Sequence, residues 1–235
     1  MIRIIHAFPD LLNLYGGDAD LQVLRAYLQA VGEEVSVAPL AADTVAAADL
    51  IYFGAGTENK MLAAAQKLMP LRDALLAYYE AGGQMLFVGA AAALPMRNII
   101  GLDAKETLGL GLVDGKVTIH DKRHYSEVLA ECPFCEHAII GSYNSSLQIQ
   151  TQASAFLRVT FDSDRKVDDL EGVCDKGLVA TQVAAPLLVR NPGLLDYYAR
   201  TLAGKQLPDP EEIWYRRAWM GYVCAADALK NSIHK

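Results

Sequence analysis

Residues 82–93 read GGQMLFVGAAAA, and this segment decides the expected fold. Its four consecutive apolar residues, 85–88, are typical of a strand that is buried on both faces. Gly89 follows directly, and the alanines that begin at Ala90 continue a turn of small residues. Doubly wound parallel sheets place their ligand sites at such carboxyl ends of strands. The segment therefore predicts an α/β fold with a candidate site at this turn.

The chain before this segment alternates short apolar runs with helical patterns. Apolar runs predict strands at residues 2–5, 35–37 and 50–53. Apolar residues at helical spacing predict a helix over residues 21–31 that ends at Gly32. A second helical region spans residues 60–81 and is interrupted at Pro70. This alternation indicates a doubly wound, mostly parallel sheet with flanking helices.

The strand predicted at residues 50–53 also ends in small residues. Gly54, Ala55 and Gly56 follow it directly. Residues without bulky side chains allow a ligand to approach the backbone closely. We therefore expect this loop to belong to the same site.

After residue 107 the pattern changes to shorter runs that are typical of antiparallel strands and hairpins. These runs predict strands at residues 113–119, 137–143, 147–151 and 156–161, which we expect to continue the same sheet. The charged residues 161–172 favour a solvated hairpin loop, with a cation site as the alternative. Closing helices are predicted over residues 192–203 and 211–230. Without repeats or flexible linkers, residues 1–235 are expected to form a single domain of the α/β class with added antiparallel strands.

The composition disfavours several classes of function. The chain has 235 residues, 52% of them hydrophobic, which is enough to bury a large core. A formal net charge of -7 leaves no basic patch to neutralise phosphates, so no nucleic-acid partner is expected. No apolar run approaches the roughly 18 residues that cross a bilayer, and the N-terminus lacks the pattern of a signal peptide. We therefore expect a cytoplasmic protein without membrane insertion.

The four cysteines are too few for a disulfide scaffold in a chain of this size. Cys132 and Cys135 form a C-x-x-C motif with His137 close behind, a pattern that can bind zinc or form a redox pair. A structural zinc site needs four ligands, and no second motif completes the set. Ordinary loop cysteines are the simpler interpretation, and no metal or cofactor is expected.

Five segments together resemble a known enzyme family. They are residues 9–16 (PDLLNLYG), 53–59 (FGAGTEN), 109–114 (GLGLVD), 140–144 (IGSYN) and 186–192 (PLLVRNP). In this order they are similar to the cobyric acid synthase-like class I glutamine amidotransferases, above all to the glutaminase subunits of lipid II isoglutaminyl synthases. The resemblance covers nearly the whole chain, and its first and last segments are together the most specific.

The resemblance also implies that the catalytic residues are missing. The family's nucleophilic cysteine falls on Gly89, its general-base histidine on Ala184 and a further arginine on Gln148. Glutamine hydrolysis needs a thiolate to attack the side-chain amide and a base to activate that thiol, and neither glycine nor alanine can do this. The joint loss of several positions favours natural degeneration over a single engineered change. No catalytic residue is therefore expected.

The loops around the missing catalytic residues could still form a pocket. Backbone N–H groups near Gly54, Ala55, Gly56 and Ala90 would remain to stabilise negative charge. Gln148 would complete this expected pocket, because it stands at the position of the family's arginine.

Three functional hypotheses remain open. The first is a non-catalytic subunit whose partner, by resemblance, is a Mur-ligase-like ATP-dependent enzyme that acts on a peptidoglycan precursor. The second is an active glutaminase subunit of the lipid II or cobyric acid type, or another enzyme, that uses an unrecognised site. The third is a small-molecule binding module that uses the vacated pocket, which small apolar groups would line.

Two further groups of residues need an interpretation. Trp214, Trp219 and Tyr222 could form a partner-binding face, but their spacing also fits core packing, which we favour. The remaining thiols and the imidazoles fall in no nucleophile–base pattern: Cys174, Cys224, His6, His120, His124, His137 and His234. They are interpreted as structural or solvated residues.

Overall fold

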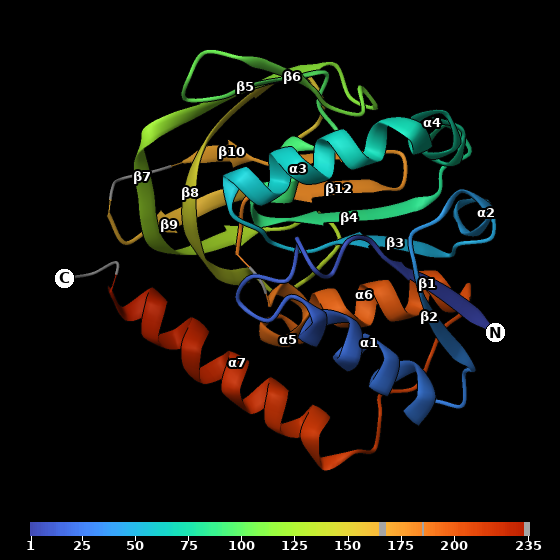
Figure 1. Ribbon diagram of the computed structural model, residues 1–235. Coiled ribbons are helices and arrows are strands. Elements are labelled where there is room, and N and C mark those ends of the chain that lie inside the picture. Colours follow the sequence, from blue (N-terminus) through green and yellow to red (C-terminus); the bar gives the residue numbers. More distant parts are fainter. Residues whose placement is uncertain (165–167, 185, 233–235) are drawn as a thin grey trace.

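The computed structural model describes residues 1–164, 168–184 and 186–232, and it contains two β-sheets with helices around the first (Figure 1). The first sheet has the order β11-β12-β4-β3-β1-β2. Its strands are β1 (Ile2–His6), β2 (Val35–Pro39), β3 (Leu50–Phe53), β4 (Gln84–Val88), β11 (Val173–Asp175) and β12 (Leu178–Thr181). All neighbours pair in parallel except β11 and β12. The predicted doubly wound α/β fold is confirmed.

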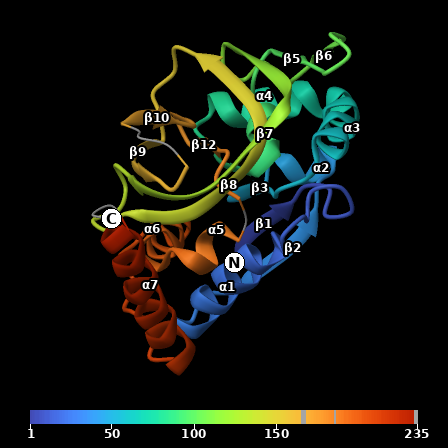
Figure 2. The ribbon, with the colours of Figure 1, turned by 90° about the vertical axis from the view of Figure 1, so that its left-hand side faces the viewer.

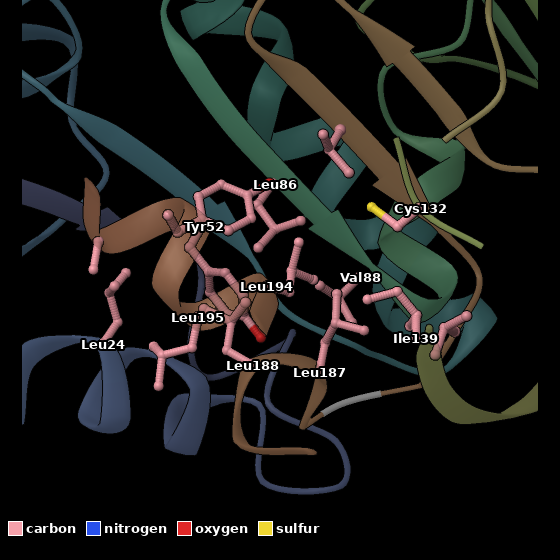
Figure 3. Packing of buried hydrophobic residues seen from close by; sticks show 14 of the residues in the cluster. Leu24, Tyr52, Leu86, Val88, Cys132, Ile139, Leu187, Leu188, Leu194 and Leu195 are labelled. Carbon is pink, nitrogen blue, oxygen red and sulfur yellow. The ribbon is translucent and has the colours of Figure 1, made fainter. Parts of the chain in front are cut away.

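The two faces of this sheet carry alternate residues of each strand. On one face, Tyr52 and Leu86 pack against α1 (Asp18–Ala30), α5 (Leu187–Arg190) and α6 (Pro192–Ala203). Figure 3 shows this packing, with Leu24, Tyr52, Leu86, Val88, Leu187, Leu188, Leu194 and Leu195 gathered in one cluster.

The opposite face packs against α3 (Glu58–Leu68) and α4 (Arg72–Glu80). There the rings of Phe53 and Phe87 stack with their centroids 4.2 Å apart. Both faces are buried, which explains the continuous apolar runs of β3 and β4.

The helix boundaries follow local sequence signals. Gly32, two residues after the end of α1, has a φ of 88°, a conformation that glycine adopts without steric cost. Pro70 lies in the short 3₁₀ helix η1 (Met69–Leu71), which separates α3 from α4. Thr57 caps α3, because its hydroxyl accepts the N–H of Lys60 at 3.3 Å. The short helix α2 (Ala42–Val45) precedes β3.

The later strands form a second sheet, so the expectation that they continue the first sheet was wrong. This sheet has the order β10-β9-β7-β5-β6, and β8 pairs with β7. Its strands are β5 (Asn98–Ile100), β6 (Glu106–Leu108), β7 (Gly115–Glu131), β8 (Ile139–Thr151), β9 (Leu157–Asp162) and β10 (Asp169–Glu171). The strands β7 and β8 pair with each other along most of their length, and most of their buried hydrophobic residues belong to the same two hydrophobic clusters as the first sheet.

Two details of this sheet differ from the predicted strands. The runs at 137–143 and 147–151 belong to the single strand β8, and residues 120–131, which were not predicted as a strand, complete β7. The pairing of β7 with β8 shifts register between Ile119 and His124, which bends the hairpin. The charged region between β9 and β10 does join two antiparallel strands, although residues 165–167 lie outside the described part.

The last helix, α7 (Ile213–Ser232), runs along the outside of the molecule (Figure 2). Tyr222 is buried and its hydroxyl donates to the carbonyl of Ala138 at 2.7 Å. The ring of Trp219 meets that of His137 edge-on at 4.8 Å, and Trp214 packs partly buried beside Tyr215. Core packing therefore accounts for these aromatic residues. Within the described residues, no helix is long and apolar enough to span a bilayer.

Candidate functional site

The candidate site lies where β3, β4 and β12 end side by side. In the sheet register Val88 pairs with Thr181, so Gly89 follows one strand at the level where Gln182 follows the other. Ala184 stands two residues further along. The loop of Gly54 begins at the end of the next strand, β3. The topology therefore brings together the positions expected for the nucleophile and the base and the small-residue loop.

The turn after β4 has the geometry of a nucleophile elbow without a nucleophile. Gly89 has a φ of 64° and begins the 3₁₀ helix η2 (Gly89–Ala93). Such a sharp strand-to-helix turn presents a catalytic side chain in enzymes that carry one. A residue with a Cβ pays roughly 1–2 kcal/mol for this left-handed conformation, so glycine relaxes the turn.

The space for a side chain at this position is filled. A Cβ built on Gly89 would lie 2.9 Å from the Cβ of Ala55 and 3.4 Å from its Cα. Ala55 is only 2% exposed, and Ala91, Ala92 and Ala93 are fully buried. The position therefore lacks both a reactive group and the room for one.

The backbone of residues 11–14 packs directly against the small-residue loop at 54–56. A Cβ on Gly54 would lie 2.3 Å from the carbonyl oxygen of Leu12, and one on Gly56 would lie 2.9 Å from the Leu12 side chain. The N–H of Leu14 donates to the carbonyl of Ala55 at 2.8 Å. On this side, the backbone of residues 11–14 occupies the place where the sequence suggested a ligand.

The base position is held against β8 by backbone bonds. The N–H of Ala184 donates to the carbonyl of Ser142 at 2.8 Å, and Val183 forms an isolated bridge with Tyr143. Ala184 is buried and carries no group that could accept a proton. Ala185 lies outside the described residues.

A buried carboxylate anchors the segment that follows the base position. The two oxygens of Asp20 accept the backbone N–H groups of Leu187 at 2.9 Å and Leu188 at 2.7 Å, at the start of α5. The hydroxyl of Tyr52 donates to Asp20 at 2.9 Å. Burial raises the pKa of Asp20, and these hydrogen bonds oppose the shift. Asp20 thus caps a helix other than its own.

An asparagine fixes the other end of α5. The side chain of Asn191 accepts the N–H of Ile140 at 2.8 Å and donates to the carbonyls of Ile140 and Leu187, each at 2.9 Å. Asn191 is 1% exposed. Segment 186–192 therefore has a structural role, because it ties α5 to β8 and to the loop of the base position.

A polar network joins the β7–β8 hairpin to the small-residue loop. Glu58, at the start of α3, accepts Arg123 Nη2 at 2.6 Å and Ser146 Oγ at 2.7 Å. Arg123 Nη1 donates to the carbonyl of Asn144 at 2.8 Å, and Asn144 donates to the hydroxyl of Tyr15 at 2.6 Å. Burial works against the charged form of Glu58, but the bonds from Arg123 and Ser146 prevail and lower its pKa. This network was not predicted, because its members are scattered along the sequence.

Gln148 lies away from the small-residue loop. It is exposed on β8, and its side-chain oxygen lies 3.0 Å from His120 Nε2. It lines a cavity of about 640 Å³, together with Gln182 and Glu171. Of the five residues expected to share one pocket, Gln148 alone lines this cavity. The expected pocket is thus divided, because residues 11–14 cover the loop at Gly54.

The cavity contains a buried carboxyl group. Glu171 is 8% exposed, and it accepts Thr181 Oγ1 at 2.8 Å and the N–H of Gln182 at 2.7 Å. Burial raises its pKa to about 7, although both hydrogen bonds oppose the shift. The amide oxygen of Gln182 accepts Ser145 Oγ at 2.7 Å, which fixes the side chain that flanks the cavity.

His124 also lines the cavity, and it contacts a serine and an aspartate. Its Nε2 lies 2.8 Å from Asp162 Oδ2 and 2.9 Å from Ser126 Oγ. A Ser-His-Asp relay uses different ring nitrogens for the serine and the aspartate. Here both partners share one nitrogen, so the three residues do not form such a relay. Within the described part of the chain, no group of three or more His, Cys, Asp or Glu residues is arranged to hold a metal ion.

Comparisons with known proteins agree with this fold. No family model matches the chain. The chain is 24% identical over 222 residues to the lipid II isoglutaminyl synthase (glutamine-hydrolyzing) subunit GatD of Staphylococcus aureus (strain N315). This match covers 90% of this chain and 89% of that protein.

Solved structures show the same architecture at low sequence identity. A crystal structure of a glutamine amidotransferase matches with a TM-score of 0.56 and 13% identity, over 85% of this chain and 98% of that one. PurLQS from Thermotoga maritima matches with a TM-score of 0.53 and 14% identity, over 86% of this chain and 96% of that one. The glutaminase domain of Trypanosoma brucei CTPS with bound acivicin matches with a TM-score of 0.50 and 14% identity, over 90% of this chain and 97% of that one. The fold is that of the class I glutamine amidotransferases.

Proposed function

We propose that this chain is a glutamine amidotransferase-like subunit that has lost its glutaminase activity. The turn at Gly89 is the observation that carries the proposal. It keeps the left-handed backbone of a nucleophile elbow, but it has no thiol, and Ala55 fills the space of a side chain. Without a nucleophile and a base, backbone donors near Gly54 and Ala90 leave at most residual catalysis.

The partner is inferred from the similar protein. That protein is named as a subunit of lipid II isoglutaminyl synthase. We infer that this chain likewise associates with an amidating enzyme, a Mur-ligase-like ATP-dependent subunit that acts on a peptidoglycan precursor. Such a complex would take free ammonia, because this subunit cannot release ammonia from glutamine. Four unpaired thiols are typical of a reducing compartment, which supports a cytoplasmic location.

Restoring the two side chains is expected to leave the protein inactive. The wild type should not release glutamate from glutamine, because it has no thiol at position 89. The variant Gly89→Cys/Ala184→His should not release it either, because the Cβ of the new cysteine meets Ala55 and the thiol cannot take its catalytic place. The left-handed φ alone is expected to cost the variant roughly 1–2 kcal/mol of folding stability. Coupled-enzyme glutamate assays and denaturant unfolding measure the two effects. Gly89→Ala is the matched control for backbone strain, and glutamate release by the wild type would contradict the proposal.

The partner is tested separately. The tagged full chain is purified from its native host, and a Mur-ligase-like protein is expected in a fixed ratio. Amidation by the purified pair should then proceed with ammonium chloride and fail with glutamine. Recovery of the chain alone would refute the partnership, whereas glutamine-dependent amidation would refute the loss of glutaminase activity.

A second candidate function is small-molecule binding in the cavity of about 640 Å³. Its described lining includes the carboxylates Asp169 and Glu171 and the imidazole of His124, but no lysine or arginine. A cationic amine therefore fits this lining better than an anion or a molecule without net charge. Calorimetric titration with glutamine, glutamate and small amines is expected to show saturable heat only for amines. A flat titration in all three cases would remove this candidate.

A further inference from the structure

The C-x-x-C motif forms a tight turn between β7 and β8. The N–H of Cys135 donates to the carbonyl of Cys132 at 3.3 Å, with Pro133 and Phe134 between them. A β-turn holds its first and fourth Cα atoms within about 7 Å. Disulfides span Cα separations of about 4.4–6.8 Å. The backbone therefore already holds the two cysteines close to the separation that a disulfide requires.

A surface cavity opens onto both thiols. Its volume is about 430 Å³, and Cys132 and Cys135 line it together with residues of α7. Cys132 is 8% exposed, while Cys135 is more accessible. A small reagent can therefore reach the pair from solvent without unfolding of the hairpin.

The two thiols differ in character. A hydrogen bond from Cys135 lowers the pKa of Cys132 and outweighs the effect of burial. The same bond, together with burial, raises the pKa of Cys135. The thiolate is the reactive form of cysteine, so we assign Cys132 as the attacking thiol and Cys135, at the other end of the same turn, as the thiol that resolves its oxidised form.

We propose that Cys132 and Cys135 are a reversible redox pair that a small hydroperoxide oxidises. The Cys132 thiolate attacks one peroxide oxygen, the O–O bond breaks, and protonation of the leaving oxygen gives water and a Cys132 sulfenic acid. The Cys135 sulfur then attacks the Cys132 sulfur. An S–S bond forms, the S–O bond breaks, and the hydroxide leaves as water with the Cys135 proton. Two thiols and one hydrogen peroxide thus become one disulfide and two waters.

The charge around the cavity selects the oxidant. Glu131, Glu136 and Asp227 line it, against a single lysine, Lys230, in the described lining. Anionic disulfides would be repelled by this acidic lining, whereas a neutral peroxide would not.

The turn is also fixed by its neighbours. Phe134 stacks on Tyr197 of α6 with centroids 4.7 Å apart, and His137 contacts Trp219 of α7. Because these contacts hold the turn in place, the two sulfurs stay near each other in the folded chain. Oxidation is therefore expected to close this disulfide in preference to others.

The experiment treats the reduced full-length chain with hydrogen peroxide, alkylates the free thiols and digests with trypsin. Cleavage after Arg123 and Arg158 leaves Cys132 and Cys135 in one peptide, without Cys174 or Cys224. The expected product is this peptide, lighter by about 2 Da and unalkylated, and dithiothreitol should restore both thiols. Full alkylation of both thiols after peroxide, or a cross-link from Cys132 to Cys174, would overturn the proposal.

Single variants separate a redox pair from ordinary buried thiols. In Cys135→Ser the resolving thiol is absent, so Cys132 is expected to proceed to the sulfinic acid, which dithiothreitol does not reverse. Cys224→Ser, which changes an exposed thiol on α7, is the matched control and should form the disulfide as the wild type does. Cys132 that stays unoxidised in Cys135→Ser would argue against its role as the nucleophile.

Discussion

The substitution Asp20→Ala is expected to lower the free energy of unfolding by roughly 3–5 kcal/mol. Asp20 is fully buried and accepts the N–H groups of Leu187, Leu188 and Val189, the last at 3.3 Å, as well as the hydroxyl of Tyr52. Alanine would leave the four donors without this acceptor, and three of them belong to the fully buried residues Tyr52, Leu187 and Leu188. Domains are commonly stable by only about 5–15 kcal/mol, so the loss is a large share of the total.

Urea denaturation followed by circular dichroism measures this effect. Asp20→Asn keeps one acceptor oxygen and is expected to lose roughly 1–3 kcal/mol. Asp18→Ala is the matched control, because Asp18 lies in the same helical turn and its side chain accepts a hydrogen bond from Gln22 at the surface. It should cost about 1 kcal/mol or less. Equal losses for Asp18→Ala and Asp20→Ala would show that the cap contributes nothing specific.

Stability is expected to fall as the pH rises from 5 to 8 because of Glu171. Burial raises the pKa of Glu171 from an ordinary value of 4.5 to about 7. The folded protein therefore holds this proton more tightly than the unfolded chain does. The resulting stabilisation is complete below the unfolded pKa and is lost as the pH passes through about 7. Between pH 5 and 8 it amounts to about 2–3 kcal/mol.

The variant Glu171→Gln isolates this contribution. Its amide cannot titrate, so the difference in unfolding free energy between the wild type and the variant should change by about 2–3 kcal/mol across this pH range. Carboxyl groups with lowered pKa values, such as Asp162 and Glu58, titrate at more acidic pH. They are present in both the wild type and the variant, so they do not affect the difference. A difference that stays constant from pH 5 to 8 would refute the buried titration.

The sequence predicts the first half of the fold well. The apolar runs of β1, β3 and β4 and the helical spacing of α1 are local signals, and each element lies where they indicate. The second sheet was not predicted, because exposed charged residues interrupt the apolar pattern in the middle of β7 and because β7 also pairs with β9, which does not follow it directly in the sequence. Local patterns do not encode such pairing.

The candidate site was only partly predictable for a similar reason. The positions Gly89 and Ala184 follow from strand ends and from the family resemblance, and the topology brings their strands together. The contact of Ala55 with Gly89 and the cover over Gly54 depend on tertiary packing, which spacing along the chain does not show. Buried polar partners such as Asp20 and Leu187 are separated by most of the chain.

The contact between Ala55 and Gly89 has a consequence for the evolutionary history of this chain. Under the proposed function, a return to catalysis would require a thiol at position 89, room beside it at Ala55 and an imidazole at position 184. A cysteine at position 89 would strain the turn and clash with Ala55. It would do so before any activity existed that selection could favour. Each step alone would lower fitness or leave it unchanged. Under the proposed function, the descendants of this protein can therefore diverge as binding subunits more readily than they can regain glutaminase activity.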